Sequence, residues 1–161
     1  MEHHVPYSHI IVDEDGIGGG VVDQMKGIKG FIANSQAFPN KQTHQDENYA
    51  NLKAQCYAKL ADLINSRRMG ITLDSDEHKE KLLEELGVVK RKNMDDDRKF
   101  KIITKEEMKE LIGRSPDFSD AAMMRMYFEV SPQSTSGVSQ QFIPTARQYI
   151  PNRVLMGKLV Q

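Results

Sequence analysis

The chain has 161 residues, enough for one domain with a sizeable core, and its 39% hydrophobic and 28% charged residues fit a soluble globular protein. The formal net charge is −1, so any surface that binds nucleic acid has to be a local basic patch. A single cysteine, Cys56, excludes an internal disulfide framework and a cysteine zinc cluster. No apolar run is long enough to span a membrane, and the first residues lack the pattern of a signal peptide, so we expect an intracellular protein.

The first predicted element is a buried strand over residues 9–13 that runs into three acids, Asp13, Glu14 and Asp15. A glycine-rich segment follows and opens a helix over 19–26. Residues 28–33 are apolar enough for a second strand. Crossover connections between parallel strands are right-handed, so this short β–α–β unit predicts two parallel neighbouring strands.

The acids at the end of the first strand have two interpretations. Chemistry in open α/β sheets gathers at the carboxyl ends of strands, which favours a functional site here. Asp is also favoured in solvated turns and at helix caps, so the same residues fit a purely structural turn. A dinucleotide site is excluded, because Gly16, Gly18 and Gly20 lack the G-x-G-x-x-G spacing and the acids would repel a phosphate.

The clearest helix covers residues 49–68, after a polar loop over 34–48 that we expect to be exposed. Its apolar residues recur at helical spacing and predict one buried face. Cys56 lies in this pattern and is interpreted as a small core residue.

A short strand or extended segment is expected at 71–73, followed by a helix over 76–86 that begins at the cap residues Asp74 to Asp76. Gly87 is expected to end this helix. The residues expected to face the core are Leu82, Leu83 and Leu86.

Residues 88–93 and 98–104 flank an acidic turn at 94–97 and predict a β-hairpin. Its basic residues are Lys90, Arg91, Lys92, Arg98, Lys99 and Lys101. They fit either a phosphate-binding surface or a solvated hairpin of alternating charge, and Asp95 to Asp97 at the tip would repel a phosphate.

Thr104 and Glu107 form a capping box that opens a helix to about residue 112. The last helix, expected from Asp120 to about Glu129, begins near Asp117 or Ser119. Asp117 and Asp120 are three residues apart and share one face of its first turn. There they fit either a functional acid pair or an N-cap with a first-turn acid.

Two acid clusters from distant parts of the chain, both at the ends of elements, indicate a site for a hard cation. Mg²⁺ and Mn²⁺ take oxygen ligands, usually a few carboxylates together with water and substrate phosphate. Such ions activate water and stabilise the leaving oxygen in phosphodiester cleavage.

A set of segments carries a resemblance to a known family: VDEDGIGGGVVDQM at 12–25, GIKGFIANSQA at 27–37, NYANLKAQCYAKLAD at 48–62, GITLDSD at 70–76 and ITKEEMKELIGRSPDFSDA at 103–121. In this order they resemble the C-terminal nuclease domain of the large terminase subunit of tailed bacteriophages. The resemblance covers about residues 9–128. It implies an α/β, RNase H-like fold, with a mixed sheet flanked by helices and an added β-hairpin.

The resemblance also implies a function. The family packages DNA into procapsids, and its nuclease domain cuts concatemeric DNA with Mg²⁺ or Mn²⁺. The implied partners are double-stranded DNA, the portal and procapsid, and the small terminase subunit, with no membrane. The implied location is the host bacterial cytoplasm, transiently at the procapsid.

The site residues implied by the resemblance are carried over by position. Asp13 resembles the family's second catalytic acid and Asp120 its third, with Asp117 as a helper. Asp13 and Asp120 are expected to approach closely enough to share a cation, with Asp15 or Asp117 at the rim. The hairpin at 88–104 resembles the family's hairpin near the DNA path, so its basic residues are the expected phosphate contacts.

The family's first acid lies on a strand ahead of anything present in this sequence. The resemblance therefore predicts a partial nuclease domain at 9–130. Residues 1–8 are interpreted as a lead, and residues 131–161, rich in Ser, Gln and Pro, as a polar tail. A weak nuclease, or none, is expected, with self-association covering an open sheet edge. The alternatives are an inactive remnant or interaction module that binds DNA or the portal, and a different metal-dependent phosphoesterase or resolvase of the same fold.

Overall fold

The computed structural model describes residues 4–15, 18–92 and 99–132. The tip of the predicted hairpin with Arg98, and nearly all of the predicted tail at 131–161, lie outside the described residues. A 3₁₀ turn at Tyr7–His9 precedes the first strand. No helix among the described residues is long and apolar enough to cross a membrane.

The predicted β–α–β unit is confirmed. Strand β1 (Ile11–Asp13), helix α1 (Gly18–Gln24) and strand β2 (Lys29–Phe31) follow one another, and the two strands pair in parallel. The register places Asp13 opposite Phe31, which is 1% exposed, so the acidic end of β1 lies beside a core residue of β2.

Helix α2 (Leu52–Asn65) is the longest helix among the described residues and is shorter at both ends than predicted. It begins later because the Asn51 side chain caps it by accepting a hydrogen bond from the amide of Ala54. Cys56 is fully buried on this helix, and burial raises the pKa of its thiol to about 12. Its interpretation as a small core residue is therefore confirmed.

Helix α3 (Asp76–Val88) begins as predicted, with Ser75 as its N-cap. The expectation that Gly87 ends it was wrong, because the helix continues to Val88 and the amide of Val89 bonds to the carbonyl of Leu86. A glycine near a helix end weakens the helix without breaking it. Leu83 was also predicted wrongly, since it is 43% exposed while Leu82 and Leu86 are buried.

The predicted hairpin is confirmed by antiparallel pairing of β3 (Arg91–Lys92) with β4 (Lys101–Ile102). The described strands form two separate two-stranded sheets, one parallel and one antiparallel, and not one mixed sheet. Residues 71–73 form no strand. The mixed α/β composition is therefore confirmed, while the single mixed sheet is not formed within the described residues.

Helix α4 (Lys105–Ile112) begins with the predicted capping box, in which the Thr104 and Glu107 side chains each bond to the other residue's backbone amide. The last predicted helix begins at Asp117 and is split into α5 (Asp117–Arg125) and α6 (Tyr127–Val130). The break falls at Met126, a buried residue whose amide reaches back to the carbonyls of Met123 and Met124.

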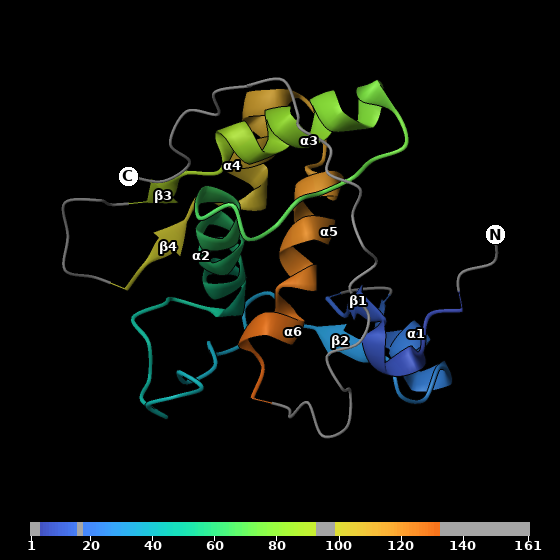
Figure 1. The fold of residues 1–161 in the computed structure, drawn as a ribbon, viewed down its shortest axis with the longest axis vertical. Coiled ribbons are helices and arrows are strands. Elements are labelled where there is room, and N and C mark those ends of the chain that lie inside the picture. The colour runs from blue at the N-terminus through green and yellow to red at the C-terminus, as the bar shows by residue number, and fades with distance from the viewer. Residues whose placement is uncertain (1–3, 16–17, 93–98, 133–161) are drawn as a thin grey trace.

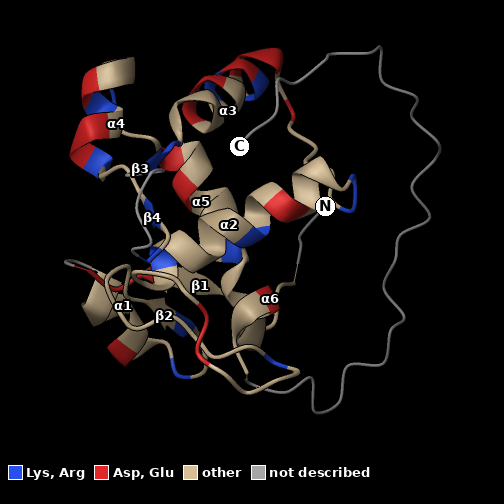
Figure 2. Ribbon diagram, turned by 90° about the vertical axis from the view of Figure 1, so that its left-hand side faces the viewer, with Lys and Arg blue, Asp and Glu red and all other residues tan. Residues whose placement is uncertain are grey.

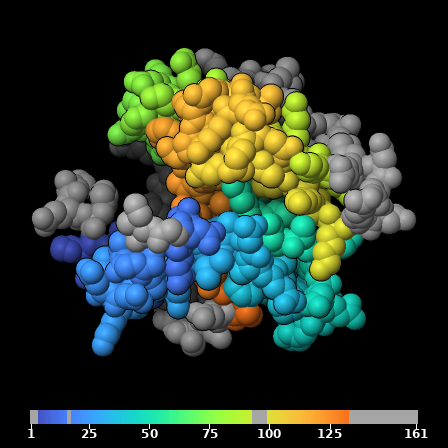
Figure 3. All heavy atoms as spheres, turned by 180° about the vertical axis from the view of Figure 1, so that it is seen from behind, coloured from blue at the N-terminus to red at the C-terminus, as the bar shows by residue number. Residues whose placement is uncertain are grey.

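The helices α2 and α5 pack side by side at the centre of the molecule, with the two small sheets on opposite sides of them (Figure 1). Charged residues of both signs follow one another along α3, which carries exposed ion pairs such as Lys81 with Glu77 (Figure 2). Seen from behind, the N-terminal unit in blue lies beneath α4 and α5 in yellow and orange (Figure 3). The buried core residues are Phe31, Leu52, Cys56, Tyr57, Leu60, Leu82, Leu86, Ile102, Met108, Met123, Met126 and Val130.

The polar loop over 34–48 is anchored to α2 by one buried side chain. The Gln55 amide oxygen accepts a hydrogen bond from the Phe38 amide at 2.9 Å, and its nitrogen donates to the Phe38 carbonyl at 2.8 Å. The same nitrogen reaches a carboxylate oxygen of Glu47 at 3.0 Å. The prediction that this loop is exposed is confirmed, since its residues are exposed or half-buried, and these bonds hold it against α2.

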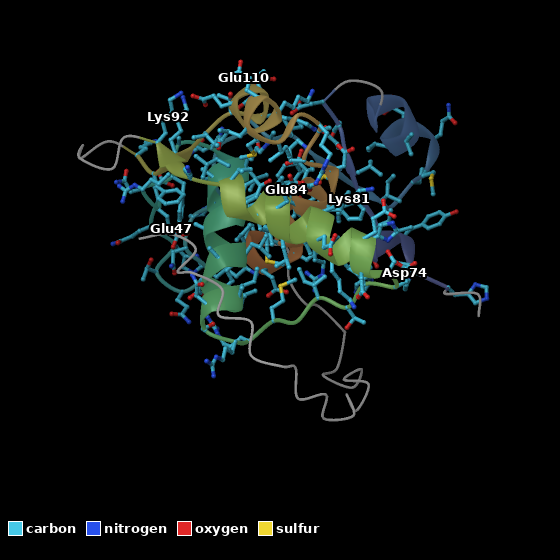
Figure 4. The ribbon with its side chains drawn as sticks, turned by 90° about the horizontal axis from the view of Figure 1, so that it is seen from above. Glu47, Asp74, Lys81, Glu84, Lys92 and Glu110 are labelled. Atoms are coloured by element: carbon cyan, nitrogen blue, oxygen red, sulfur yellow. The ribbon has the colours of Figure 1, made fainter. Side chains whose placement is uncertain are left out.

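A buried carboxylate joins α3 to the start of α5. Glu85 is completely buried and pairs with the guanidinium of Arg114, which also binds Glu84 at 2.6 Å. The second oxygen of Glu85 accepts a hydrogen bond from the amide of Ser119 at 2.7 Å, in the first turn of α5. Figure 4 looks down on α3, with Glu84 and Lys81 labelled. This pair fixes where α5 begins, because one of its free first-turn amides is satisfied from α3.

We predict that Arg114→Met lowers the free energy of unfolding by about 3 kcal/mol, because it leaves the buried Glu85 carboxylate without its cation. Arg125→Met is the matched control, since Arg125 forms an exposed pair with Glu129 on the helix surface. It should cost less than about 0.5 kcal/mol. Denaturant unfolding of both variants measures the difference, and equal losses would show that Glu85 does not depend on Arg114.

Candidate functional site

Asp13 lies exposed at the end of β1, ahead of α1. Its Oδ1 accepts a hydrogen bond from the amide of Asp15 at 3.1 Å, the geometry of an Asx turn. A Cβ on Gly18 would lie 1.6 Å from the Asp13 carbonyl oxygen, so only glycine fits there. The structural interpretation of Asp13 as a turn residue therefore has support.

The two following acids bend toward β2. Asp15 Oδ2 accepts a hydrogen bond from the amide of Ala33 at 3.0 Å. The Glu14 carboxylate lies over Gly30, where an added Cβ would come within 1.7 Å of its oxygen. Asp15 thus closes the end of the parallel strand pair, and Glu14 packs on that pair.

Asp120 is held by groups from two other helices. Its side chain, in the first turn of α5, is 13% exposed. Oδ1 lies 3.3 Å from Lys53 Nζ and 3.0 Å from the hydroxyl of Tyr57, both on α2. Oδ2 lies 2.9 Å from Nζ of Lys105, the first residue of α4.

These contacts decide the charge of Asp120. Burial raises the pKa of its carboxyl, but the charges of Lys53 and Lys105 and the hydrogen bond from Tyr57 outweigh burial, so the pKa falls below its usual value. The carboxylate is therefore ionised at neutral pH. Burial alone would lower the pKa of the Lys105 ammonium. The hydrogen bond and charge of Asp120, followed by the charges of Asp117 and Asp13, outweigh burial, so the pKa of Lys105 is raised.

A groove of about 540 Å³ joins the two predicted acid clusters. Because α5 packs against β1, Asp13, Asp15 and Asp120 all line this groove. The other charged residues that line it are Lys53, Lys101, Lys105, Glu106 and Lys109. Asp117 is exposed on α5 and is not among the lining residues, although its charge acts on Lys105. Whether Asp13 and Asp120 share a cation stays a prediction.

Carboxylates and lysine ammonium groups line this groove together. Among residues 4–15, 18–92 and 99–132, no group of three or more His, Cys, Asp or Glu side chains has the geometry to hold a metal ion. The carboxylates are instead paired with lysines or with backbone amides. The arrangement can bind an anion through its lysines, or a cation that competes with those lysines for Asp120.

The basic residues predicted for DNA contact are not equivalent in the structure. Lys101 lines the groove, while Lys90 and Lys99 are exposed. Lys92, labelled in Figure 4, pairs with Glu107 at 2.7 Å. The guanidinium of Arg91 lies 5.4 Å from the centroid of the Phe100 ring. Their role in DNA binding stays a prediction, and Arg98 lies outside the described part of the chain.

Sequence reasoning did not find Lys53, Tyr57 and Lys105 as partners of Asp120. One local signal was present, since Lys53 and Tyr57 are four residues apart and share a helix face, with the ammonium 5.8 Å from the ring centroid. Lys53 and Tyr57 lie close to Lys105 because α2 and α4 pack around α5. No local sequence pattern predicts this packing.

The fold and the site together define a class of protein. It is an α/β protein in which carboxylates and lysines line one groove beside a parallel strand pair. No protein family profile matches the sequence, and no curated protein gives a significant match. Among solved structures, the chain is similar to the nuclease domain of the large terminase subunit gp2 of bacterial virus Sf6, with 28% sequence identity and a TM-score of 0.56.

The match covers 74% of this chain and 64% of the solved one, so it spans less than two thirds of that domain. The resemblance to terminase nuclease domains, seen first in the ordered segments of the sequence, is confirmed by this match.

We predict that Asp120→Asn lowers the free energy of unfolding by about 2 kcal/mol at pH 7, because it removes the acceptor of a charge-assisted network. The pKa of Asp120 is lowered from 3.8, so its stabilisation is present above that pH and is lost as the pH falls through the lower folded value. The difference from wild type should therefore shrink at pH 3.

Denaturant unfolding at pH 7 and pH 3 measures this change. Asp117→Asn, in the same turn but exposed, is the control and should change stability by less than about 0.5 kcal/mol at either pH. An Asp120→Asn loss that is equal at the two pH values would contradict the assignment of its charge.

Proposed function

We propose that this chain is a DNA endonuclease domain of the terminase large-subunit type, which cuts concatemeric DNA during genome packaging. The observation that carries the proposal is its similarity to a terminase nuclease domain over 74% of its length. The groove beside β1 supports it, because Asp13 and Asp120, the acids implied by the resemblance, both line it. No specific observation favours the inactive interaction module.

The carboxylates of this groove fit a hard divalent cation, Mg²⁺ or Mn²⁺. Such ions are bound through one or two carboxylates together with water and substrate phosphate, and need no complete protein cage. Asp13 and Asp120 would hold the cation, with Asp15 at the rim. When bound, it supplies an activated water and charge stabilisation of the leaving oxygen.

The lysines of the groove have a separate part in this proposal. Lys53 and Lys105 keep the Asp120 carboxylate ionised when no metal ion is bound, so that it is ready to act as a ligand. Their ammonium groups face the groove together with Lys101, where they attract the phosphate of a DNA strand. Asp117 is a helper that acts through the charge of Lys105.

Double-stranded DNA is the proposed substrate, and the basic residues of the β3–β4 hairpin are proposed to extend its path from the groove. Lys101, on β4, belongs to both surfaces. Binding through phosphates falls steeply as salt rises. We further propose an RNase H-like topology, action with the portal and small terminase subunit, and a location in the host cytoplasm, all on the strength of the family resemblance.

We predict slow nicking of supercoiled plasmid by the wild-type chain with Mn²⁺, and none with EDTA. Asp13→Asn and Asp120→Asn should each reduce nicking on the order of 100-fold, because each removes a proposed ligand. Asp117→Asn should cost less, since Asp117 does not line the groove.

Asp76→Asn, on the exposed start of α3, is the matched control for nicking and should leave the rate unchanged. Circular dichroism of each variant confirms that it is folded. Nicking by Asp13→Asn and Asp120→Asn at the wild-type rate would overturn the proposed function.

A further inference from the structure

Buried hydrogen bonds reach Asp120 from α2, beside the contact that Lys53 makes with the same carboxylate oxygen. Tyr57, on α2, is 3% exposed, and its hydroxyl lies 3.0 Å from Asp120 Oδ1 and 3.1 Å from Ser119 Oγ. Ser119 is completely buried, and its backbone amide donates to the buried carboxylate of Glu85. One side chain of α2 thus connects two consecutive residues of α5.

The directions of these bonds follow from counting protons. Tyr57 carries one hydroxyl proton, and the carboxylate of Asp120 can only accept, so that proton goes to Asp120. Ser119 also carries one hydroxyl proton, and only the serine can then supply a proton to the contact between the two hydroxyls. Ser119 Oγ also lies 3.1 Å from the Pro116 carbonyl, an alternative acceptor that fixes the serine in the same place.

The hydroxyl of Tyr57 is not needed for packing. A phenylalanine would fill the same space in the core, whereas a buried hydroxyl costs free energy unless it is hydrogen-bonded. Its partners are the two α5 residues that define where the Asp120 carboxylate points. Carboxylates that bind metals are in turn held by hydrogen bonds, and losing such a partner typically weakens metal binding 10- to 100-fold.

We propose that Tyr57 is a positioning residue, which with Ser119 fixes the Asp120 carboxylate in the orientation that binds a divalent cation. This rests on the proposed function, because it assumes that Asp120 is a ligand. Lys53 and Lys105 neutralise Asp120 from flexible stems, whereas Tyr57 lies in the packed core and holds one oxygen in place. Tyr57 selects the geometry, and the lysines supply the charge.

The test is a titration of the whole chain with Mn²⁺ alone, read from the electron paramagnetic resonance signal of the free ion. Tyr57→Phe should bind Mn²⁺ about 10-fold more weakly than wild type. Tyr49→Phe is the matched control, because Tyr49 packs edge-on against Phe100 and does not line the groove. It should bind as wild type does, within about twofold.

Ser119→Ala supplies the second variant. If the two hydroxyls act through one hydrogen-bond chain, it should also weaken Mn²⁺ binding, and the double variant should be no worse than the weaker single one. Thermal unfolding of each variant separates this effect from a general loss of stability.

If Tyr57→Phe binds Mn²⁺ as tightly as wild type does, the positioning role alone is overturned. The same holds if Tyr49→Phe weakens Mn²⁺ binding as much as Tyr57→Phe does. Fully additive losses in the double variant would also overturn it. A wild-type chain that does not bind Mn²⁺ would overturn the proposed function, and the positioning role with it.

Discussion

The structure depends on the compensation of one partly buried charge, the carboxylate of Asp120, which connects three of its helices. Asp120 lies on α5, its cations Lys53 and Lys105 come from α2 and α4, and the hydroxyl of Tyr57 reaches it from the core. A carboxylate in this position is tolerated only when such partners replace water. The three helices therefore have to meet at this point for the charge to be satisfied.

A second buried carboxylate fixes the helix that carries the first. Glu85 binds Arg114 and the amide of Ser119, so α3 holds the beginning of α5 in place. Since α5 also packs against β1, the end of that strand and the first turn of α5 face one groove. Ionic and hydrogen bonds between elements thus help to position the site, together with the apolar core.

The local elements could be predicted from the sequence wherever a short pattern decides them. The apolar run before Asp13 and the glycines after it specify the parallel β–α–β unit, and the spacing of Thr104 and Glu107 specifies the start of α4. The candidate acids Asp13 and Asp120 were found in the same way, with the help of the family resemblance, and the structure places both in one groove.

What could not be predicted depends on contacts between distant segments. The lysines around Asp120 come from two other helices, and the burial of Glu85 depends on Arg114, 29 residues away. Gly87 does not end α3, because one glycine near a helix end weakens the helix without breaking it, and the last predicted helix is split at the buried Met126. Nor could the two strand pairs be assigned to separate sheets in advance.

The central claim is that Asp13 and Asp120 share a divalent cation in the groove beside β1. Anomalous diffraction from crystals soaked in Mn²⁺ tests it most directly. We predict one strong peak between the two carboxylates, within bonding distance of both, with the ammonium groups of Lys53 and Lys105 moved away from Asp120. A peak elsewhere, or a groove in which both lysines keep their contacts at saturating Mn²⁺, would contradict it.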